Sequence, residues 1–471
     1  MRHSWVRLAI LIALFLGAGL YPADRDVVAA VQRGDQLVQE RHYSAALATY
    51  AWAGERYPGS ALPHLRQGEV YLVQGRHEEA WSAYLRALML GADGEALEGL
   101  WQLYQDAGDF ALAIETVERI LAHAPERGDL WAVLGTLSRE AGEPEAAVQA
   151  FTRALALEVD PLTRQSVHDQ WGTMVIESDP ATALAQFRQV VLGPDVERAG
   201  HASKLIAALE AWGSSDDLAR SRAKIGQVLL QRGDLALARR QFEIAVALQD
   251  DYVDGHAYLG HILSTLGEFE KAEEHIEQAL ALQPEYPLAL YFAGMHYARK
   301  GWLITGREIL LQAHDFDPED PGICAAVADT YLRAGQSNFG AAERWLHAAV
   351  DRAPEDVRFH LLLAHFYVDY RIDPSLRGVA VSQVAVQLAP QNSEALETLG
   401  WAYHLGSKPN AALEPMLRAE ELDPDNPRLQ YRLGEIYRAL GQTDNAIAAY
   451  QQAIDLDWGG TMGERARKAI E

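Results

Sequence analysis

The sequence repeats itself every 34 residues. Near the carboxyl end, Gly400 is followed by Gly434 at this spacing, and Tyr403 is followed by Tyr437. A fixed period of this length predicts a stack of small, similar units, each of which contacts only its neighbours. A chain of 471 residues can then form one elongated array instead of several separate globular domains.

Each unit places small residues where two helices would cross. In the first half of a unit, Gly or Ala follows a large apolar residue, as at Leu259 and Gly260. In the second half, Ala-x3-aromatic-x2-Ala recurs, as at Ala238, Phe242 and Ala245. Small residues let antiparallel helices approach closely, and the aromatic side chain fills the space between them. Glycines between the helices and prolines after the second helix mark helix ends. The pattern predicts an all-α fold.

This large-x2-Leu-Gly-x2-Tyr and Ala-x3-aromatic-x2-Ala-x4-Pro arrangement resembles the tetratricopeptide repeat. The resemblance implies a right-handed α-solenoid of antiparallel helix pairs, whose first helices line a concave face. We expect about twelve units. They begin near residues 27, 61, 94, 128, 164, 219, 253, 287, 321, 357, 393 and 427.

One stretch departs from the regular repeat. Residues 161–218 contain a degenerate unit and then one extra amphipathic helix, predicted over Val196–Trp212. An unpaired helix disturbs pairwise stacking, so we expect a joint at 196–218. The joint would divide an amino-terminal block, 27–195, from a carboxy-terminal block, 219–471.

The first residues differ from the repeats. Arg2 and Arg7 precede an uninterrupted apolar run, Leu8–Leu20. This run is shorter than the ~20 residues of a membrane span and has the length of a signal-peptide core. Residues 1–26 are therefore predicted as a signal peptide or membrane anchor, with the repeats exported from the cytoplasm. Whether the segment is cleaved stays open. If it is uncleaved, it would contact the membrane.

Charge and motifs exclude several functions. The formal net charge of −25 opposes nucleic-acid binding, which depends on clustered Lys and Arg. The sequence lacks a phosphate-binding loop, a Gly-x-Ser-x-Gly nucleophile turn and a His-Glu-x2-His zinc helix. Histidine pairs such as His256 and His261 are five residues apart and point to different helix faces. We therefore expect no enzymatic activity, no cofactor and no metal site.

The resemblance also locates a recognition surface. First-helix residues three before and one after the Gly or Ala position would point into the concave face. Aromatic and Met side chains in a groove are typical anchors for an extended peptide or a partner helix. Some of these residues could instead pack between units. The candidates are His261, Tyr291, Met295, Asp329, His365, Glu397, Trp401, His404, Tyr431 and Glu435.

The amino-terminal block offers less for recognition. Its inward positions, such as Glu98 and Asp129, are small or polar, which is typical of a spacer. Tetratricopeptide domains that bind the acidic tails of chaperones use Lys, Asn and Arg on successive first helices. Here the first two units carry apolar and acidic residues at inward positions, including Asp35 and Glu69. Binding of that kind is not expected.

Together these features predict an exported, membrane-tethered scaffold that binds protein or peptide partners in its groove. Its oligomeric state stays open. The alternative is an accessory subunit of a polysaccharide or glycan synthesis or export machine, which would contact sugars through Trp401, Tyr431 and Tyr291. Trp401, His404 and Tyr431 are further predicted to form one aromatic platform on adjacent first helices.

Overall fold

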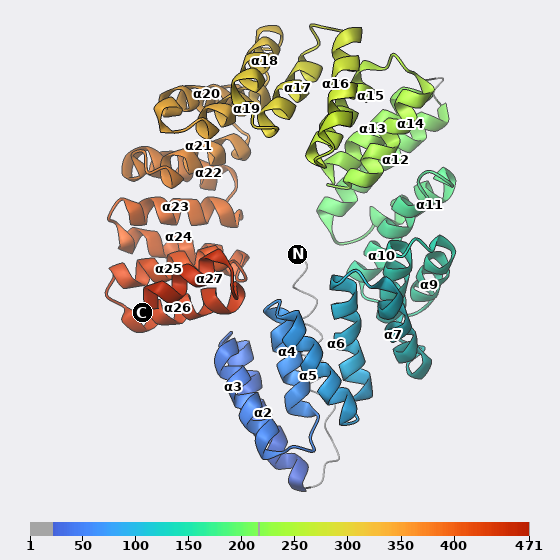
Figure 1. The fold of residues 1–471 in the computed structure, drawn as a ribbon, viewed down its shortest axis with the longest axis vertical. Coiled ribbons are helices and arrows are strands. Elements are labelled where there is room, and N and C mark those ends of the chain that lie inside the picture. The colour runs from blue at the N-terminus through green and yellow to red at the C-terminus, as the bar shows by residue number, and fades with distance from the viewer. Residues whose placement is uncertain (1–21, 215–216, 471) are drawn as a thin grey trace. The chain divides into compact units, whose positions relative to one another are not determined.

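The chain folds into helices that lie side by side in antiparallel pairs, as in an α-solenoid (Figure 1). The computed structural model describes residues 22–214 and 217–470, and it contains no β-strand in that part of the chain. The predicted all-α class is therefore confirmed. The helices form two compact units. Of the described residues, 22–150 and 425–470 belong to unit 1, and unit 2 spans 151–424.

Unit 1 contains helices from both ends of the chain, and α9 runs past its boundary at residue 150. Its helices are α2 (Pro22–Gln39), α3 (Tyr43–Arg56), α4 (Leu62–Val73), α5 (His77–Met89), α6 (Asp93–Asp106), α7 (Phe110–His123), α8 (Gly128–Glu140), α9 (Pro144–Ala156), α25 (Pro427–Ala439), α26 (Thr443–Leu456) and α27 (Thr461–Ile470).

Unit 2 holds the remaining helices, including a short 3-10 helix, η1, and a π-helical segment, η2. They are α10 (Pro161–Val175), α11 (Pro180–Val190), α12 (Val196–Ser214), α13 (Leu218–Gln231), α14 (Leu235–Leu248), α15 (Val253–Thr265), α16 (Phe269–Leu282), α17 (Pro287–Arg299), α18 (Leu303–Phe316), α19 (Pro321–Arg333), η1 (Gln336–Asn338), α20 (Phe339–Arg352), α21 (Val357–Asp369), η2 (Pro374–Gly378), α22 (Val379–Leu388), α23 (Ser393–Leu405) and α24 (Pro409–Leu422).

The small residues of the first helices allow the close pairing that the sequence predicts. A Cβ atom added at Gly434 would lie 2.4 Å from Cε1 of Tyr450, which is fully enclosed on the paired helix. At Gly260 the added atom would lie 2.7 Å from Ile276 Cγ1. In both pairs the large side chain follows 16 residues after the glycine, so one 34-residue unit contains both halves of the contact.

The turns between paired helices also follow the sequence pattern. Gly267 and Gly301 adopt φ angles of 80° and 92° directly after first helices, a conformation that side-chain-bearing residues rarely adopt. Insertions lengthen two later turns, where η1 and η2 form.

Unit 1 brings the first helices of the chain against the last. Arg41 Nη1 lies 2.8 Å from Asp425 Oδ1, and Ser44 donates a hydrogen bond of 2.6 Å to Asp455 Oδ1. The Arg76 guanidinium lies 4.5 Å from the centroid of the Trp458 ring, a cation–π contact. These contacts join α3 and the turns before α3 and α5 to α26 and the turns before α25 and α27, although they are separated by hundreds of residues.

Helix α12 occupies the stretch predicted as an extra helix. Ala202 and Leu205 on α12 are fully buried in a cluster that includes Phe187 of α11 and Ile225 of α13. The helix thus has an apolar partner on both sides. It lies wholly within unit 2, and the predicted joint at 196–218 and the division into two blocks stay predictions.

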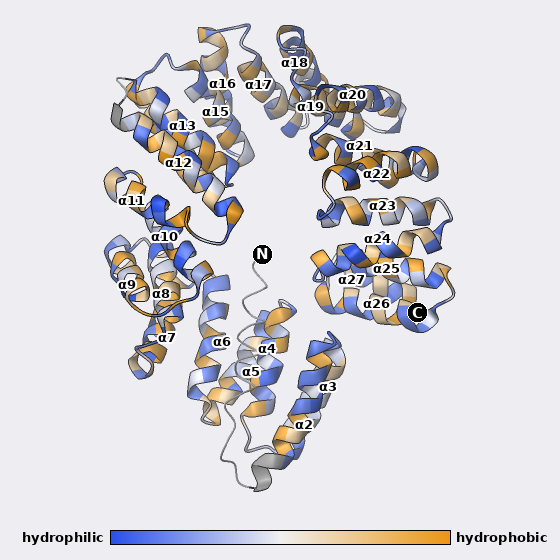
Figure 2. Ribbon diagram, turned by 180° about the vertical axis from the view of Figure 1, so that it is seen from behind, coloured by the Kyte–Doolittle hydropathy of each residue, from blue (hydrophilic) through white to orange (hydrophobic). Residues whose placement is uncertain are grey.

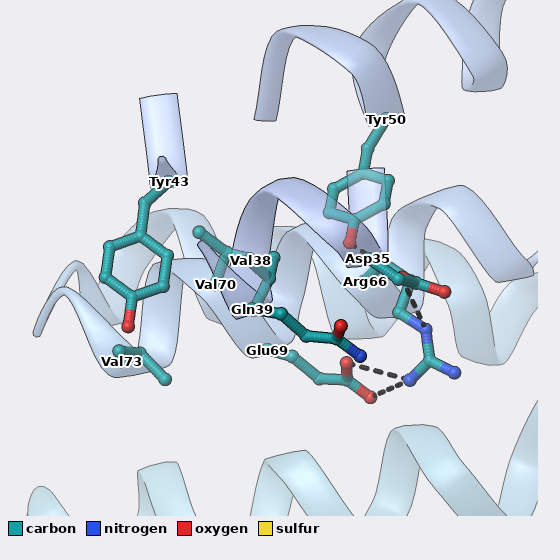
Figure 3. Close-up of a pocket in the computed structure, with 9 residues that line it drawn as sticks. All are labelled: Asp35, Val38, Gln39, Tyr43, Tyr50, Arg66, Glu69, Val70 and Val73. Atoms are coloured by element: carbon teal, nitrogen blue, oxygen red, sulfur yellow. Dashed lines mark hydrogen bonds and ion pairs between the residues drawn. The ribbon is translucent and has the colours of Figure 1, made fainter. Parts of the chain in front are cut away.

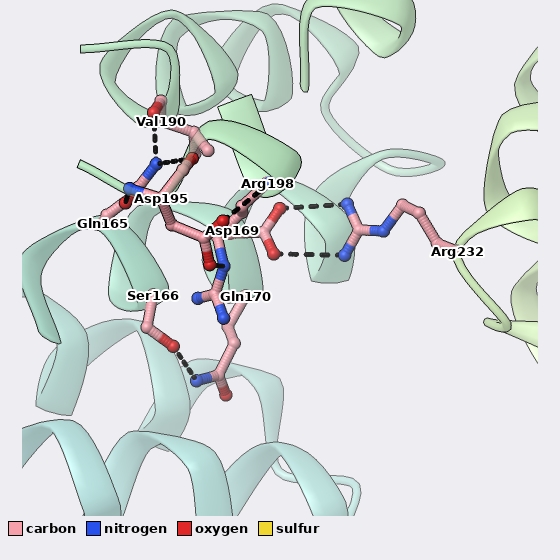
Figure 4. Close-up of polar contacts among 8 residues, drawn as sticks. All are labelled: Gln165, Ser166, Asp169, Gln170, Val190, Asp195, Arg198 and Arg232. Atoms are coloured by element: carbon pink, nitrogen blue, oxygen red, sulfur yellow. Dashed lines mark hydrogen bonds and ion pairs between the residues drawn. The ribbon is translucent and has the colours of Figure 1, made fainter. Parts of the chain in front are cut away.

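Polar contacts hold the elements around α12 together (Figure 4). The buried amide of Gln165 on α10 donates to the carbonyl oxygens of Val190 and Asp195, at 2.8 and 3.0 Å. Asp169 of α10 accepts two hydrogen bonds, of 2.9 and 3.1 Å, from the guanidinium of Arg232 just after α13. These hydrogen bonds join α10 to the residue that follows α13, although α11 and α12 separate the two in the sequence.

Hydrophobic and hydrophilic residues are interleaved along the labelled helices (Figure 2). None of the helices within residues 22–214 and 217–470 combines the length and the apolar character needed to cross a membrane. The predicted export segment, Leu8–Leu20, lies outside the described residues.

Candidate binding groove

A groove of about 390 Å³ runs across three successive first helices of unit 2, α17, α19 and α21. Its volume is in the range of sites that hold small molecules or a few side chains of a peptide. The apolar part of its lining comes from Tyr291 and Met295 on α17 and from Phe359 and Leu362 on α21. Leu362 is 45% exposed, so part of this apolar surface faces solvent.

Three predicted residues meet in this groove. Tyr291, Met295 and Asp329 all line it, and they come from two adjacent units. Burial is the main cause that raises the pKa of Tyr291, while the charges of Arg299 and Arg358 oppose the rise. Its phenol therefore stays neutral at physiological pH and can donate a hydrogen bond into the groove.

The sequence interpretation missed the cations of the groove. Arg299, Arg333 and Arg358 line it together with Asp329. Arg299 and Arg333 are the last residues of α17 and α19, one helical turn beyond the inward positions that the sequence singled out. Counting one further turn along each first helix would have located them.

His261 packs against the neighbouring repeat of unit 2. Its ring stacks on Phe292 with the ring centroids 4.3 Å apart. Burial, followed by the charge of Arg299, lowers the pKa of His261 to about 4, so the imidazole is neutral at pH 7. Its Nδ1 is buried and has no hydrogen-bond partner within the described part of the chain.

His365 joins two neighbouring repeats of unit 2 through its contacts with two carboxylates. Nδ1 lies 3.2 Å from Asp369, and Nε2 lies 3.0 Å from Glu394 at the start of α23. Burial opposes the charged imidazole, but hydrogen bonds to both carboxylates and their charges outweigh it and raise the pKa of His365. This residue is part of the packing between α21 and α23.

The remaining candidates lie in both units. In unit 2, Glu397 is buried, and Trp401 stacks on His404 with centroids 4.7 Å apart. In unit 1, Tyr431 contacts Tyr450, whose hydroxyl donates to Glu435 at 2.6 Å. The platform predicted from Trp401, His404 and Tyr431 would combine residues of both units, and it stays a prediction.

The acidic inward residues of the first two repeats, Asp35 and Glu69, belong to an ion-pair network (Figure 3). Arg66 donates to both oxygens of Glu69 at 2.7 and 2.8 Å, and its Nε lies 3.5 Å from Asp35. The Tyr50 hydroxyl donates to Asp35 at 2.7 Å. The space left beside this network is about 30 Å³, enough for one or two waters. The carboxylates of Asp35 and Glu69 therefore have partners within the chain, Arg66 and Tyr50.

Models of the tetratricopeptide repeat match residues 31–96, 100–159, 253–286 and 427–457. The chain therefore contains tetratricopeptide repeats in these segments. The number of about twelve units stays a prediction.

Two curated relatives share part of the sequence. Tetratricopeptide repeat protein 37 of Xenopus laevis is 26% identical over 167 residues, which cover 35% of this chain and 10% of the relative. Superkiller complex protein 3 of Mus musculus is 26% identical over 145 residues, covering 31% and 9%. The matches thus span about a tenth of each relative.

Solved structures similar to this chain include the crystal structure of yeast Tom70. It has a TM-score of 0.43 and 16% identity over 88% of this chain and 95% of that one. The APC/C hetero-tetramer Cut9-Hcn1 has a TM-score of 0.41 and 14% identity, covering 93% and 88%. Pseudomonas aeruginosa pilF has a TM-score of 0.38 and 18% identity, covering 45% and 95%.

Proposed function

We propose that this tetratricopeptide-repeat chain is a non-enzymatic scaffold that binds an extended segment of a partner protein in the groove of α17, α19 and α21. Tetratricopeptide-repeat proteins are generally protein-interaction scaffolds. The observation that carries the proposal is the composition of this groove, in which exposed Leu362 and half-buried Tyr291 and Met295 lie beside arginines. Apolar anchors among polar groups are what a peptide-binding groove requires.

Selection of displayed random nine-residue peptides on the full chain tests this proposal. Enriched peptides should bind the wild type and lose affinity for the double variant Met295→Ala, Leu362→Ser. Loss of central apolar anchors typically costs about 2 kcal/mol or more, roughly a thirtyfold change in Kd. Ile304→Ser is the matched control, because Ile304 is 66% exposed on α18, outside the groove lining.

The outcomes separate the possible sites. Enriched peptides that bind the double variant as tightly as the wild type would place recognition elsewhere on the chain. A selection that enriches no peptide above the double variant would reject peptide recognition in this groove.

We also propose that the scaffold acts outside the cytoplasm, tethered to a membrane while the amino-terminal segment is uncleaved. The support is the sequence of Arg2, Arg7 and Leu8–Leu20. A reporter enzyme fused after Asp26 should be active only on the outer side of the membrane. Activity of the fusion in the cytoplasm would contradict the proposed location.

An alternative is an accessory role in glycan synthesis or export. It is favoured by the stacked pair of Trp401 and His404, because an aromatic face can stack on a sugar ring. Titration with soluble oligosaccharides, followed by tryptophan fluorescence, distinguishes the two functions. Sugar binding would quench the tryptophan fluorescence of the wild type and of the double variant Met295→Ala, Leu362→Ser. Because the chain has 11 tryptophans, Trp401→Ala is the variant that should lose this change. An unchanged signal in the wild type would remove this alternative.

A further inference from the structure

The groove carries an excess of positive charge in an acidic chain. Three arginines and one aspartate line it, whereas the whole chain has a formal net charge of −25. Most basic side chains of such a chain are expected to have a carboxylate nearby. The partners of the three arginines therefore decide which of them can receive a ligand.

Arg299 has no carboxylate of its own. Its Nη1 donates to Ser264 Oγ at 3.1 Å, and no ion pair within 4.0 Å includes Arg299 among the described residues. Burial lowers the pKa of Arg299, and the neighbouring charge of Arg333 lowers it further. A partly buried guanidinium beside a second one is stabilised when an anion enters between them.

Arg333 is only loosely paired. Its Nη1 lies 3.6 Å from Asp329 Oδ2, beyond hydrogen-bonding distance, and the two side chains are 43% and 58% exposed. Such an exposed pair contributes little stability and can be replaced by a carboxylate from outside. Arg358 differs, because its Nε lies 3.0 Å from each carboxylate oxygen of Asp356. Arg299 and Arg333 are thus the two arginines of the groove that can receive a carboxylate from a ligand.

A simpler explanation is that these arginines only stabilise helix ends. A cation in the last turn of a helix interacts favourably with the helix dipole. The same position, five residues after the Gly or Ala of the first helix, carries an arginine in no other unit of the carboxy-terminal block. It is occupied there by Gln231, Thr265, Asp369, Leu405 and Ala439. Arginines occur at this position only where the groove is.

We propose that Arg299 and Arg333 bind an acidic side chain of the partner segment, so that the groove selects extended peptides in which Asp or Glu adjoins an apolar residue. This inference rests on the proposed function. The guanidinium pair would hold the carboxylate by charge-assisted hydrogen bonds, while Met295 and Leu362 contact the apolar neighbour. A nucleic acid fits this site less well, because two arginines on a chain of net charge −25 offer little attraction to a polyphosphate backbone.

The peptide selection on the full chain tests the inference when the enriched pool is sequenced. We expect an excess of Asp and Glu next to Leu, Ile, Val or Phe. Fluorescence anisotropy should show that Glu→Gln in an enriched peptide weakens binding about tenfold or more, as does the double variant Arg299→Gln, Arg333→Gln. Arg344→Gln is the control for the single variant Arg333→Gln, because each removes one positive charge and Arg344 is exposed on α20, outside the groove lining. This control variant should bind the peptide as tightly as the wild type.

Further variants keep the result interpretable. Circular dichroism checks the fold of the double variant, and the single variant Arg333→Gln changes only a side chain that is 43% exposed. Replacing both arginines by Lys keeps the positive charge but removes the planar guanidinium groups that can bind a carboxylate through two hydrogen bonds. The affinity for the peptide should then lie between those of the wild type and the Gln variant.

Each outcome has a defined meaning. A peptide pool without an excess of acidic residues, or acidic peptides that bind the arginine variants as tightly as the wild type, would overturn this inference and leave the proposed function standing. A selection with no enrichment over Met295→Ala, Leu362→Ser would overturn both. Tight, arginine-dependent binding of a 15-residue oligothymidylate that displaces the peptides would assign the site to nucleic acid instead.

Discussion

The ion pair between Asp169 and Arg232 offers the sharpest test of how the irregular part of unit 2 is held together. Asp169 is 6% exposed, and two hydrogen bonds of 2.9 and 3.1 Å join its carboxylate to the guanidinium. Removing one partner of a buried pair costs roughly 3–5 kcal/mol, because the other charge is left buried. Arg232 also lies 3.0 Å from Asp234. We therefore expect Asp169→Ala to fall at the lower end, about 3 kcal/mol.

The reverse change should cost at least as much. Arg232→Ala leaves the Asp169 carboxylate buried and removes the guanidinium that donates a hydrogen bond to each of its oxygens. If the two side chains act as a pair, the double variant should be less destabilised than the sum of the single variants by about 2 kcal/mol. Arg188→Ala is the matched control, because its pair with Glu210, at 2.9 Å, also bridges neighbouring helices but is 59% and 51% exposed. The control should cost about 1 kcal/mol or less.

Hydrogen exchange followed by mass spectrometry is the suitable assay, because long repeat arrays need not unfold in one step. The amides of α10, α12 and α13 should exchange faster in the Asp169 and Arg232 variants, while those of α25 and α26 keep their wild-type rates. Additive effects of the two single changes, or losses no larger than that of Arg188→Ala, would show that this pair does not hold α10 to α13.

Three further predictions concern single side chains. Gly434→Leu should lower the free energy of unfolding by roughly 1–3 kcal/mol through overpacking against Tyr450, and an unchanged melting curve would contradict the helix pairing. Burial raises the pKa of Asp455, so its contribution to stability is present at acid pH and lost as the pH rises through the folded-state pKa. Asp455→Asn should therefore stabilise the chain at pH 7, with a gain that shrinks towards pH 4 in denaturant titrations; an equal gain at both pH values would refute the assignment. Trp401→Ala should leave peptide affinity unchanged if the groove of α17, α19 and α21 is the binding site, and loss of affinity without unfolding would move the site towards α23.

The helix pairing could be predicted from sequence because both sides of each contact lie within one repeat. Gly434 and Tyr450 are 16 residues apart, and Gly260 and Ile276 have the same spacing. Helical periodicity then fixes which faces meet. The turn glycines are equally local. Tyr291, Met295 and Asp329 could be placed in one groove for the same reason, since neighbouring units repeat the same geometry.

Contacts between distant parts of the chain follow no such period. Arg41 and Asp425 are 384 residues apart, and Ser44 and Asp455 are 411 apart. Nothing in a repeat pattern says which of many similar units meet outside the regular stack. The same limit applies to Asp169 and Arg232, because the extra helix α12 shifts the units that follow it out of the regular spacing.

The charge of the chain and the charge of the groove act over different distances, and this difference bears on specificity. Repulsion between an acidic chain and an acidic partner is a long-range effect, screened beyond roughly 8 Å at physiological salt. The contact of a carboxylate with Arg299 and Arg333 would be short and partly desolvated, so salt weakens it less. A polyanion experiences the repulsion along its whole length, whereas a single acidic residue beside an apolar one gains the contact with little of that penalty. The net charge of −25 would then exclude extended polyanions while the groove admits isolated carboxylates.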